Sequence, residues 1–310
     1  MPSLTYYLTA LVIQLKGLKK TFSESPINYH RLRRDDAPVP TSKHTLGLVT
    51  RRIPLGLGTL TELTPPKLSP PESAIFYCPG GAFVYGPTEL NWQAVANLAR
   101  QTGRRAYLLD YPKAPEHQIG TLNRSVDEAY AYLCERYAAR NLVLLGDSVG
   151  ATLLTLLLQR QLQTAAPALP NRLILVSPVA DASLSNPAIA ALDARDLMLS
   201  PAGARSAKQL CAGPVSLQSP EISPLYGSFH GFPPTTVFIA ERDIMQPDAE
   251  RLAAKMTAAG VPVGVVRGAG MPHIWPLLPV MREARAALGE LAVVISQSAH
   301  NQRPALSHSQ

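Results

Sequence analysis

One serine in the sequence stands where a hydroxyl group can become a nucleophile. Residues 146–150 read Gly-Asp-Ser-Val-Gly, after the apolar run 141–145 and before a second apolar run, 151–158. A short strand, an abrupt turn and a helix predict a nucleophile elbow, in which the hydroxyl of Ser148 is exposed above a sheet. The flanking glycines let strand and helix approach closely, because they lack a Cβ. The alternative is an ordinary strand-to-helix turn in which Ser148 only caps the helix.

A nucleophilic serine needs a base to take its proton and a third group to orient that base. In this architecture the chain order is serine, acid, histidine. His273 follows the last predicted strand, 263–266, and is the predicted base, whereas His230 is a weaker candidate. The remaining histidines precede the serine or lie in the polar tail: His30, His44, His117, His300 and His308. The alternative for His273 is a loop histidine that caps the following helix.

The predicted acid follows the preceding strand. Residues 236–240 are expected to form that strand, and they lead into Glu241-Arg242-Asp243 and a helix start at Pro247. Loops that follow such strands are where catalytic groups gather, so Asp243 is the predicted acid. Glu241 and Asp248 remain candidates for the same role. The alternative for each of these acids is that its negative charge only stabilises the start of the helix, through the helix dipole.

Backbone N–H groups are expected to bind the negative oxygen that forms when a carbonyl is attacked. Val149, directly after the serine, provides one donor. Gly80-Gly81-Ala82 follows a predicted strand, and glycine allows N–H groups to face a ligand oxygen that a side chain would block. We predict an oxyanion hole formed by Gly81, Ala82 and Val149, with Gly80 as a further donor. A tight turn is the alternative for the glycine pair.

Predicted strands and helices alternate along most of the chain. We expect strands at 74–77, 104–109, 141–145, 173–176, 236–240 and 263–266, helices at 89–101, 125–139, 247–259 and 277–295, and a hairpin within 46–63. Such alternation predicts an α/β fold with a mostly parallel central sheet and helices on both faces. Residues 45–177 and 234–297 are expected to form this core.

Three segments stand outside the alternation. Residues 178–233 separate two strands by far more than a crossover needs, and we interpret them as a cap insertion over the ligand-binding edge, with a helix in 193–211. Residues 1–44 are expected to hold an N-terminal cap helix and, from residue 23, a polar linker. Residues 298–310 are a polar tail.

The N-terminal helix carries an apolar stripe whose members alternate in steps of four and three: Leu4, Leu8, Leu11, Leu15, Leu18 and Phe22. The segment is too short and too charged for a membrane span, and it lacks the basic start of a signal peptide. We expect the stripe to pack on the protein, because most such stripes face a core. Contact with a membrane surface is the less favoured alternative.

The composition is that of a globular protein with a sizeable core, because 46% of the residues are hydrophobic and 16% are charged. The net charge of +7 is scattered, without basic runs between aromatics, so no nucleic-acid partner is expected. Cys78, Cys134 and Cys211 are odd in number and far apart. This spacing predicts neither disulfides nor a metal site and favours a cytoplasmic location.

Five segments together resemble the hormone-sensitive-lipase-like esterases and lipases, a family with the α/β-hydrolase fold. They are residues 77–83 (Tyr-Cys-Pro-Gly-Gly-Ala-Phe), 110–117 (Asp-Tyr-Pro-Lys-Ala-Pro-Glu-His), 146–150, 223–225 (Ser-Pro-Leu) and 271–273 (Met-Pro-His). The resemblance covers most of residues 74–280. It implies hydrolysis of esters with short to medium acyl chains, no cofactor, and a cap built from the N-terminal segment and the insertion.

The sequence departs from the family pattern at four positions. Pro79 stands where the family has a histidine that helps to fix the oxyanion loop, and Pro112 stands at an arginine position. Ala82 replaces a third glycine, and Val149 replaces an alanine. Because Pro79 lacks a side-chain donor but has a locked φ, the loop is expected to be held in another way.

These residues predict a serine carboxylesterase that forms an acyl-enzyme at Ser148 and hydrolyses small esters, acetyl esters included. An amide or peptide hydrolase with the same three residues is one alternative. A non-catalytic small-molecule binder is another, since a fold alone does not fix function and the family contains a plant hormone receptor of this kind. The natural substrate and the oligomeric state stay open.

Overall fold

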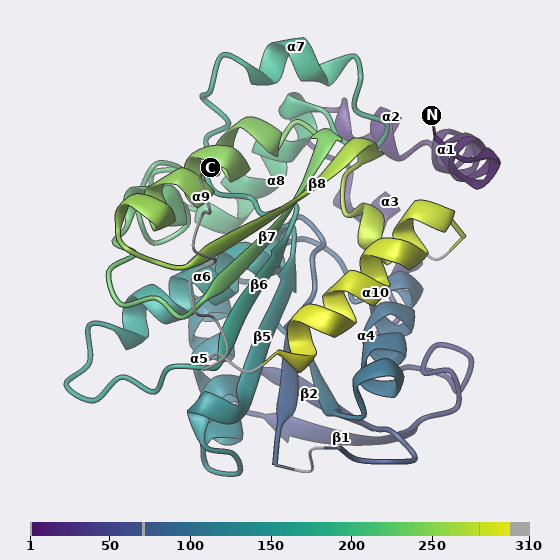
Figure 1. Cartoon of the computed structure of the whole chain (residues 1–310). Helices are drawn as coiled ribbons and strands as arrows, with labels where there is room; N and C mark the ends of the chain where they lie inside the picture. The colour runs from purple at the N-terminus through teal and green to yellow at the C-terminus, as the bar shows by residue number, and fades with distance from the viewer. Residues whose placement is uncertain (1, 70–71, 279, 298–310) are drawn as a thin grey trace, which may run out of the picture.

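A computed structural model of the chain describes residues 2–69, 72–278 and 280–297. Within these residues the chain forms one sheet. Its strands are β1 (Val49–Leu55), β2 (Gly58–Thr64), β3 (Ala74–Cys78), β4 (Arg105–Asp110), β5 (Leu142–Asp147), β6 (Arg172–Val176), β7 (Thr235–Arg242) and β8 (Val263–Pro272). They lie in the order β1-β2-β4-β3-β5-β6-β7-β8 (Figure 1).

Most of the sheet is parallel. The β1–β2 hairpin is antiparallel, β2 pairs antiparallel with β4, and the pairs from β4 through β3, β5, β6 and β7 to β8 are parallel. The central strands β3, β5 and β6 are buried along their whole length, as continuous apolar strands with both faces covered must be. The predicted α/β fold with a mostly parallel sheet is confirmed.

Helices cover both faces of the sheet and also lie beyond one of its edges. The α-helices are α1 (Leu4–Lys16), α2 (Leu18–Phe22), α3 (Tyr29–Leu32), α4 (Glu89–Thr102), α5 (Ile119–Cys134), α6 (Val149–Gln161), α7 (Ile189–Asp193), α8 (Pro201–Ala212), α9 (Gln246–Ala258) and α10 (Arg282–Ser296). Short 3₁₀ turns are η1 (Arg33–Asp35), η2 (Ala139–Asn141), η3 (Pro224–Tyr226) and η4 (Trp275–Leu277). Helices α4 and α10 pack on one face, and α5, α6 and α9 on the other (Figure 1).

The parallel strands bring the predicted site residues to one edge of the sheet. Ser148 directly follows β5, Asp243 follows β7 and His273 follows β8. In open α/β sheets the carboxyl ends of the strands form the crevice where ligands bind. The topology therefore places together three residues that are far apart in the sequence.

Two segments lie over this edge, and we call them the cap: residues 4–35, from α1 to η1, and residues 189–226, from α7 to η3. They pack directly against each other. A Cβ on Gly203 in α8 would lie 2.3 Å from the carbonyl oxygen of Phe22 in α2, so the two helix backbones are in contact. The Lys19 ammonium forms an ion pair with Asp193 and also binds a carbonyl of the second segment.

The prediction that the N-terminal stripe forms one helix packed on the protein is wrong. Gly17, with a φ of 66°, ends α1 and separates it from α2. Tyr6 and Ile13 are the buried residues of α1 and face inward, and the Tyr6 hydroxyl accepts a hydrogen bond from Arg242. Four stripe residues on α1 are exposed instead: Leu4, Leu8, Leu11 and Leu15. Within the described residues, no helix is long and apolar enough to cross a membrane.

Several predicted bounds also differ from the structure. The helix expected at 125–139 is α5, which starts six residues earlier, and the helix expected at 277–295 starts only at Arg282, after η4. The helix expected at 193–211 begins only at Pro201, as α8, because Pro201 lacks an N–H and can begin a helix but not continue one, and α7 ends at Asp193. The expected linker contains α3 and η1. The predicted tail, 298–310, lies outside the described residues.

The contact between α6 and β3 predicts that Gly150→Ala destabilises the protein strongly. A Cβ at residue 150 would lie 2.0 Å from the carbonyl oxygen of Cys78. Because the Cβ is fixed to the backbone of α6 and the oxygen belongs to the backbone of β3, no side-chain rotation can relieve this clash. Urea unfolding should show a loss of about 3 kcal/mol or more. Gly289→Ala in α10 is the matched control, because its Cβ meets nothing within 4 Å and alanine favours a helix by about 0.5–1 kcal/mol. Equal stability of Gly150→Ala and wild type would contradict this packing.

Candidate active site

Ser148 occupies the strained turn that the sequence pattern predicts. Its φ of 50° and ψ of −121° are unfavourable for a residue with a Cβ, and its N–H is held by the carbonyl of Val176 at 2.9 Å. A Cβ on Gly146 would lie 2.6 Å from the N atom of Ala151, which is why the turn needs a glycine there. The turn directs the serine hydroxyl away from the sheet and into the space under the cap.

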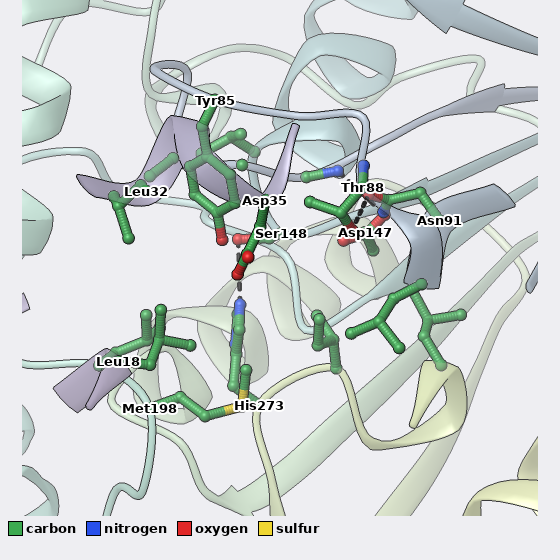
Figure 2. Close-up of a pocket in the computed structure, with 18 of the residues that line it drawn as sticks. Leu18, Leu32, Asp35, Tyr85, Thr88, Asn91, Asp147, Ser148, Met198 and His273 are labelled. Carbon is green, nitrogen blue, oxygen red and sulfur yellow. Dashed lines mark hydrogen bonds between the residues drawn. The ribbon is translucent and has the colours of Figure 1, made fainter. Parts of the chain in front are cut away.

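Ser148, His273 and Asp243 form one chain of contacts, of which Figure 2 shows the contact between Ser148 and His273. The Nε2 atom of His273 lies 3.0 Å from the Ser148 Oγ, and its Nδ1 atom lies 2.7 Å from the Asp243 Oδ2. The three residues are 9%, 4% and 1% exposed, so water screens these contacts very little. The structure thus brings the predicted nucleophile, base and acid within hydrogen-bonding reach of one another.

The loops that carry the acid and the base are themselves held by hydrogen bonds. The other carboxylate oxygen of Asp243 accepts the N–H of Met245 at 2.8 Å. The N–H of Ile274, next to the histidine, donates to the Ser177 hydroxyl at 3.0 Å. Glu241 accepts the N–H of Gly270 at 2.8 Å, so this candidate acid supports the histidine loop and does not contact the histidine.

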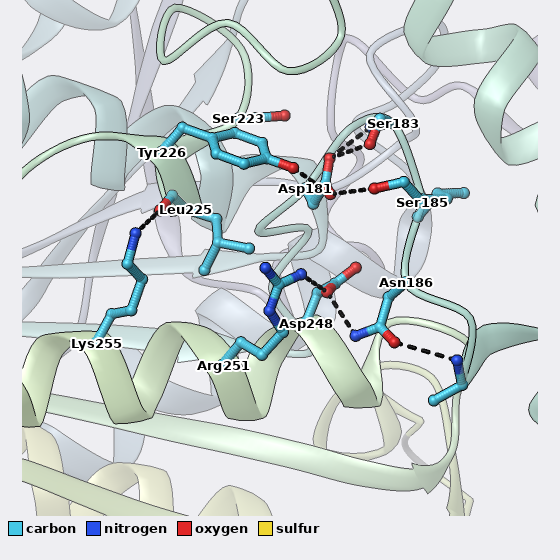
Figure 3. Close-up of polar contacts among 12 residues, drawn as sticks. Asp181, Ser183, Ser185, Asn186, Ser223, Leu225, Tyr226, Asp248, Arg251 and Lys255 are labelled. Atoms are coloured by element: carbon cyan, nitrogen blue, oxygen red, sulfur yellow. Dashed lines mark hydrogen bonds and ion pairs between the residues drawn. The ribbon is translucent and has the colours of Figure 1, made fainter.

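Asp248 and His230, the remaining candidates for acid and base, lie away from the serine. Asp248 binds Asn186 at 3.0 Å and Arg251 at 2.8 Å, and thereby ties the start of α9 to the segment that follows β6 (Figure 3). Lys255 on α9 also holds this segment, through a backbone carbonyl (Figure 3). His230 is exposed and lies in a turn outside the cavity that opens onto the serine.

The loop after β3 is held by its backbone and by Asp147, the residue before the nucleophile. The N–H of Gly80 donates to Asp147 Oδ1 at 3.0 Å, and the Tyr77 hydroxyl donates to the same oxygen at 2.5 Å. Asn91 completes the network by donating to the Tyr77 hydroxyl. The N–H of Gly80 is therefore not free for an oxyanion, which corrects the sequence-based prediction for that residue.

Three successive residues of this loop have a positive φ: 129° at Gly81, 52° at Ala82 and 68° at Phe83. The carbonyl of Gly81 accepts the N–H groups of residues 84 and 85, which closes a tight turn. Within the described part of the chain, the N–H groups of Gly81 and Ala82 have no protein acceptor. Val149 is the first residue of α6, where the N–H lacks an intrahelical partner. These three N–H groups remain the expected oxyanion donors.

A cavity of about 630 Å³ opens onto the serine. Its walls come from the oxyanion loop, the histidine loop and both cap segments, including Phe22 in α2 and Met198 before α8. Leu18, Leu32 and Tyr85 also point into it (Figure 2). Side chains of the cap therefore form part of the wall around the space that a substrate would occupy.

Comparisons with known proteins agree with this geometry. A sequence model of the alpha/beta hydrolase fold matches residues 75–277. The chain belongs to the α/β-hydrolase fold family. An esterase of Acinetobacter venetianus is 29% identical over 221 residues, which are 70% of this hydrolase and 73% of that protein. An acetyl-hydrolase of Streptomyces hygroscopicus is 27% identical over 216 residues, with 69% and 72% of the two chains covered.

A solved structure shows the same fold over nearly the whole chain. The crystal structure of an esterase from the bacterial hormone-sensitive lipase family aligns with a TM-score of 0.83 and 23% identity, and covers 96% of this hydrolase and 99% of that chain. The α/β-hydrolase fold implied by the resemblance to hormone-sensitive-lipase-like esterases is thus confirmed, and the sequence model over residues 75–277 shows the α/β-hydrolase family.

The hydrolase compensates for the missing family histidine at position 79. The carbonyl of Pro79 accepts a hydrogen bond from the buried Tyr111 hydroxyl at 2.9 Å, and the next N–H binds Asp147. Both sides of the residue are therefore anchored without a side-chain donor at this position. Tyr111 belongs to the segment 110–117, which indicated only the family resemblance, and the sequence alone does not assign a partner to its hydroxyl.

Sequence reasoning missed one buried carboxylate beside the site. Asp196, in the cap, accepts the N–H of Ile244 at 2.9 Å with one oxygen and the N–H groups of Met198 and Leu199 at 2.8 Å with the other. It therefore ties the cap to the loop that carries Asp243. Burial, followed by the charge of Asp243, raises the pKa of Asp196 to about 6.

The charges around His273 favour its protonated form. Burial lowers the pKa of the imidazole, but the charge of Asp243, the hydrogen bond to it and the charge of Asp196 together raise the pKa above its ordinary value. Burial also lowers the pKa of Lys208 in α8, another residue of the cavity wall, to about 7. The site is therefore a buried group of titratable residues whose ionisation states depend on one another.

This coupling predicts that Asp196→Asn lowers the pKa of His273, because a negative charge that favours imidazolium is removed. The pKa can be followed by NMR of the imidazole protons across a pH titration. The variant should also be about 1–3 kcal/mol less stable, since an amide nitrogen would face a backbone N–H. Glu135→Gln, at an exposed carboxylate, is the control and should change neither quantity. An unchanged histidine pKa in Asp196→Asn would contradict the electrostatic role.

Proposed function

We propose that this hydrolase is a serine carboxylesterase that forms an acyl-enzyme at Ser148. The observation that carries the proposal is the buried relay from the serine hydroxyl to His273 at 3.0 Å and from His273 to Asp243 at 2.7 Å. A strained serine backbone costs about 1–3 kcal/mol, which a protein that only binds a ligand has no need to maintain. The relay and the strain together favour catalysis over the non-catalytic binder.

The reaction follows from the proton positions in the relay. Asp243 keeps a proton on Nδ1 of His273, so Nε2 is free to take the proton of Ser148 as its Oγ attacks the ester carbonyl carbon. His273 then donates this proton to the departing alkoxide, and the acyl group stays on Oγ. Water attacks the acyl carbon with His273 again as base, which releases the carboxylate product and restores the serine.

The proposed oxyanion donors are the N–H groups of Gly81, Ala82 and Val149. They stand around the serine in a space with little water, where oriented donors stabilise a developing charge most strongly. The first residue of α6 adds the positive end of the helix dipole. The loss of a single donor in such a site lowers kcat by roughly 10²–10³-fold.

The proposed substrates are uncharged esters with short to medium acyl chains, acetyl esters included. The names of the relatives, an esterase and an acetyl-hydrolase, support ester substrates. The cavity of about 630 Å³ has room for more than an acetyl group, and its cap wall includes the apolar side chains of Phe22 and Met198 beside charged ones such as Arg31 and Lys208. An acyl chain of several carbons therefore has both the space and apolar side chains to pack against.

The first test is the hydrolysis of p-nitrophenyl esters from acetyl to dodecanoyl. Ser148→Ala should lower turnover by at least about 10³-fold, because the nucleophile is absent and only binding and the oxyanion donors remain. Ser185→Ala, at an exposed serine outside the cavity, is the control and should keep wild-type rates. Turnover in Ser148→Ala equal to wild type would contradict the proposal.

A matched ester and anilide pair then separates an esterase from an amide hydrolase, with the ester expected to react faster.

The pH profile is the second test. Because His273 must be neutral to accept the serine proton and its pKa is raised, kcat/KM should fall as the pH drops through a value above 6.5. Asp243→Asn should lower kcat by about 10⁴-fold, since the amide no longer selects the correct tautomer. It should also move the acidic limb to lower pH, because the charge that raises the histidine pKa is lost. A wild-type profile that stays flat down to about pH 5 would contradict the role of His273.

A further inference from the structure

The outward face of α1 is an apolar feature on the cap surface. Six large apolar side chains form it, and we call them the α1 outer face: Leu4 (76% exposed), Tyr7 (57%), Leu8 (51%), Leu11 (52%), Val12 (52%) and Leu15 (79%). At about 100° per residue they occupy a single stripe of the helix. Contiguous exposed patches of this kind mark interaction sites on proteins that are otherwise polar at the surface.

This face cannot turn inward, because contacts on the other sides of the helix fix its orientation. Tyr6 and Ile13 lie opposite the stripe and are buried. The N–H and hydroxyl of Ser3 both donate to Glu283 at the start of α10, at 2.6 and 2.8 Å. The helix therefore stands at the margin of the molecule (Figure 1), and its leucines are exposed.

Basic side chains gather at the carboxyl end of the same helix. Lys16 and Lys20 are exposed, and the guanidinium of Arg31 lies against Gly17, where α1 ends. Arg34 is exposed nearby on the same cap segment. In the described part of the chain none of these four cations forms an ion pair. An apolar stripe with unpaired cations at its edge has the charge that complements an anionic surface.

The inward side of α1 contributes to the wall of the Ser148 cavity. Ile13 and Lys16 of α1, and Leu18 and Phe22 of α2, all line that cavity. A surface in contact with the outward leucines of α1 would therefore lie against the helix whose other side encloses the cavity. The position gives the face a role that a random apolar patch would lack.

We infer that the α1 outer face docks on an anionic phospholipid surface, with the leucines in the acyl boundary and Lys16 and Lys20 at the headgroups. An apolar helix face bordered by lysines is the arrangement that lies in the plane of a membrane interface. A second copy of the chain fits less well. The face consists of six residues on one helix about 20 Å long, whereas a stable interface uses about 20–30 residues on each partner. Two copies would also bring their own cations together.

Vesicle flotation of the full chain tests this inference. The probes are vesicles of phosphatidylcholine alone and vesicles in which a third of the lipid is phosphatidylglycerol. Wild type should float with the anionic vesicles and bind phosphatidylcholine at least tenfold more weakly. Leu8→Glu/Leu11→Glu/Leu15→Glu should reduce binding to the anionic vesicles at least tenfold. Lys16→Gln/Lys20→Gln should weaken it by roughly fivefold for each lysine, since one positive charge is lost at each position.

The control carries the same new charges elsewhere. Val49→Glu/Val293→Glu places glutamates at two other exposed apolar positions, 73% and 58% exposed, and should bind vesicles like wild type. Circular dichroism and Tm verify that each variant is folded. The triple leucine variant should also hydrolyse a dissolved short ester at the wild-type rate, since none of the three leucines lines the cavity.

Two results would overturn the inference. One is wild type that does not float with the anionic vesicles, or a triple leucine variant that floats as well as wild type. The other is a concentration-dependent dimer, measured by light scattering, that the leucine substitutions abolish while vesicle binding is absent, which would assign the face to a second copy. Ser148→Ala should bind vesicles like wild type, so failure of the docking proposal and failure of the proposed catalytic role are distinguishable.

Discussion

The close packing of the α6 backbone against the end of β3 is the constraint on which the site depends. Gly150 brings the helix into contact with the carbonyl of Cys78, and Gly146 lets β5 turn into the helix without a clash. Between these two glycines the backbone of Ser148 is held at a φ of 50°. The same contact positions the oxyanion loop, because β3 leads directly into it. This one packing contact therefore fixes the positions of Ser148, the start of α6 and the expected oxyanion donors relative to one another.

Buried carboxylates around this turn are stabilised by hydrogen bonds from the backbone and from neighbouring side chains. Asp147 binds the N–H of Gly80, Asp196 binds the loop that carries the acid, and Asp243 binds the N–H of Met245 as well as His273. Charge-assisted bonds of this kind offset the cost of removing a carboxylate from water. Each carboxylate thereby fixes a loop at the sheet edge. The result is a site whose geometry is set before any substrate arrives, which is what electrostatic stabilisation of a transition state requires.

The sheet and the cap contribute different parts of the site. The groups proposed to react are on loops at the carboxyl ends of the strands, while much of the cavity wall comes from α2 and from the segment around Met198. Changes in the cap can therefore alter which esters reach Ser148 without moving the relay. The outward leucines of α1 belong to this same cap, so access to the cavity and docking on a lipid surface would be properties of one segment.

The sequence by itself determined the α/β class and predicted the turn around Ser148 and the pair Asp243 and His273 that the structure brings next to it. Each of these follows from a local pattern: an apolar strand, a turn of glycines and the order of loops along the chain. The sequence did not determine which way α1 faces. The leucine stripe has the period of a core helix, and only the contacts of Tyr6 and Ser3 with distant residues show that the other side is buried. Nor did the sequence show that Asp196 accepts a hydrogen bond from the loop that carries Asp243, or that Asp147 accepts the N–H of Gly80. These are contacts between segments far apart in the sequence, and periodicity describes only what lies within one segment.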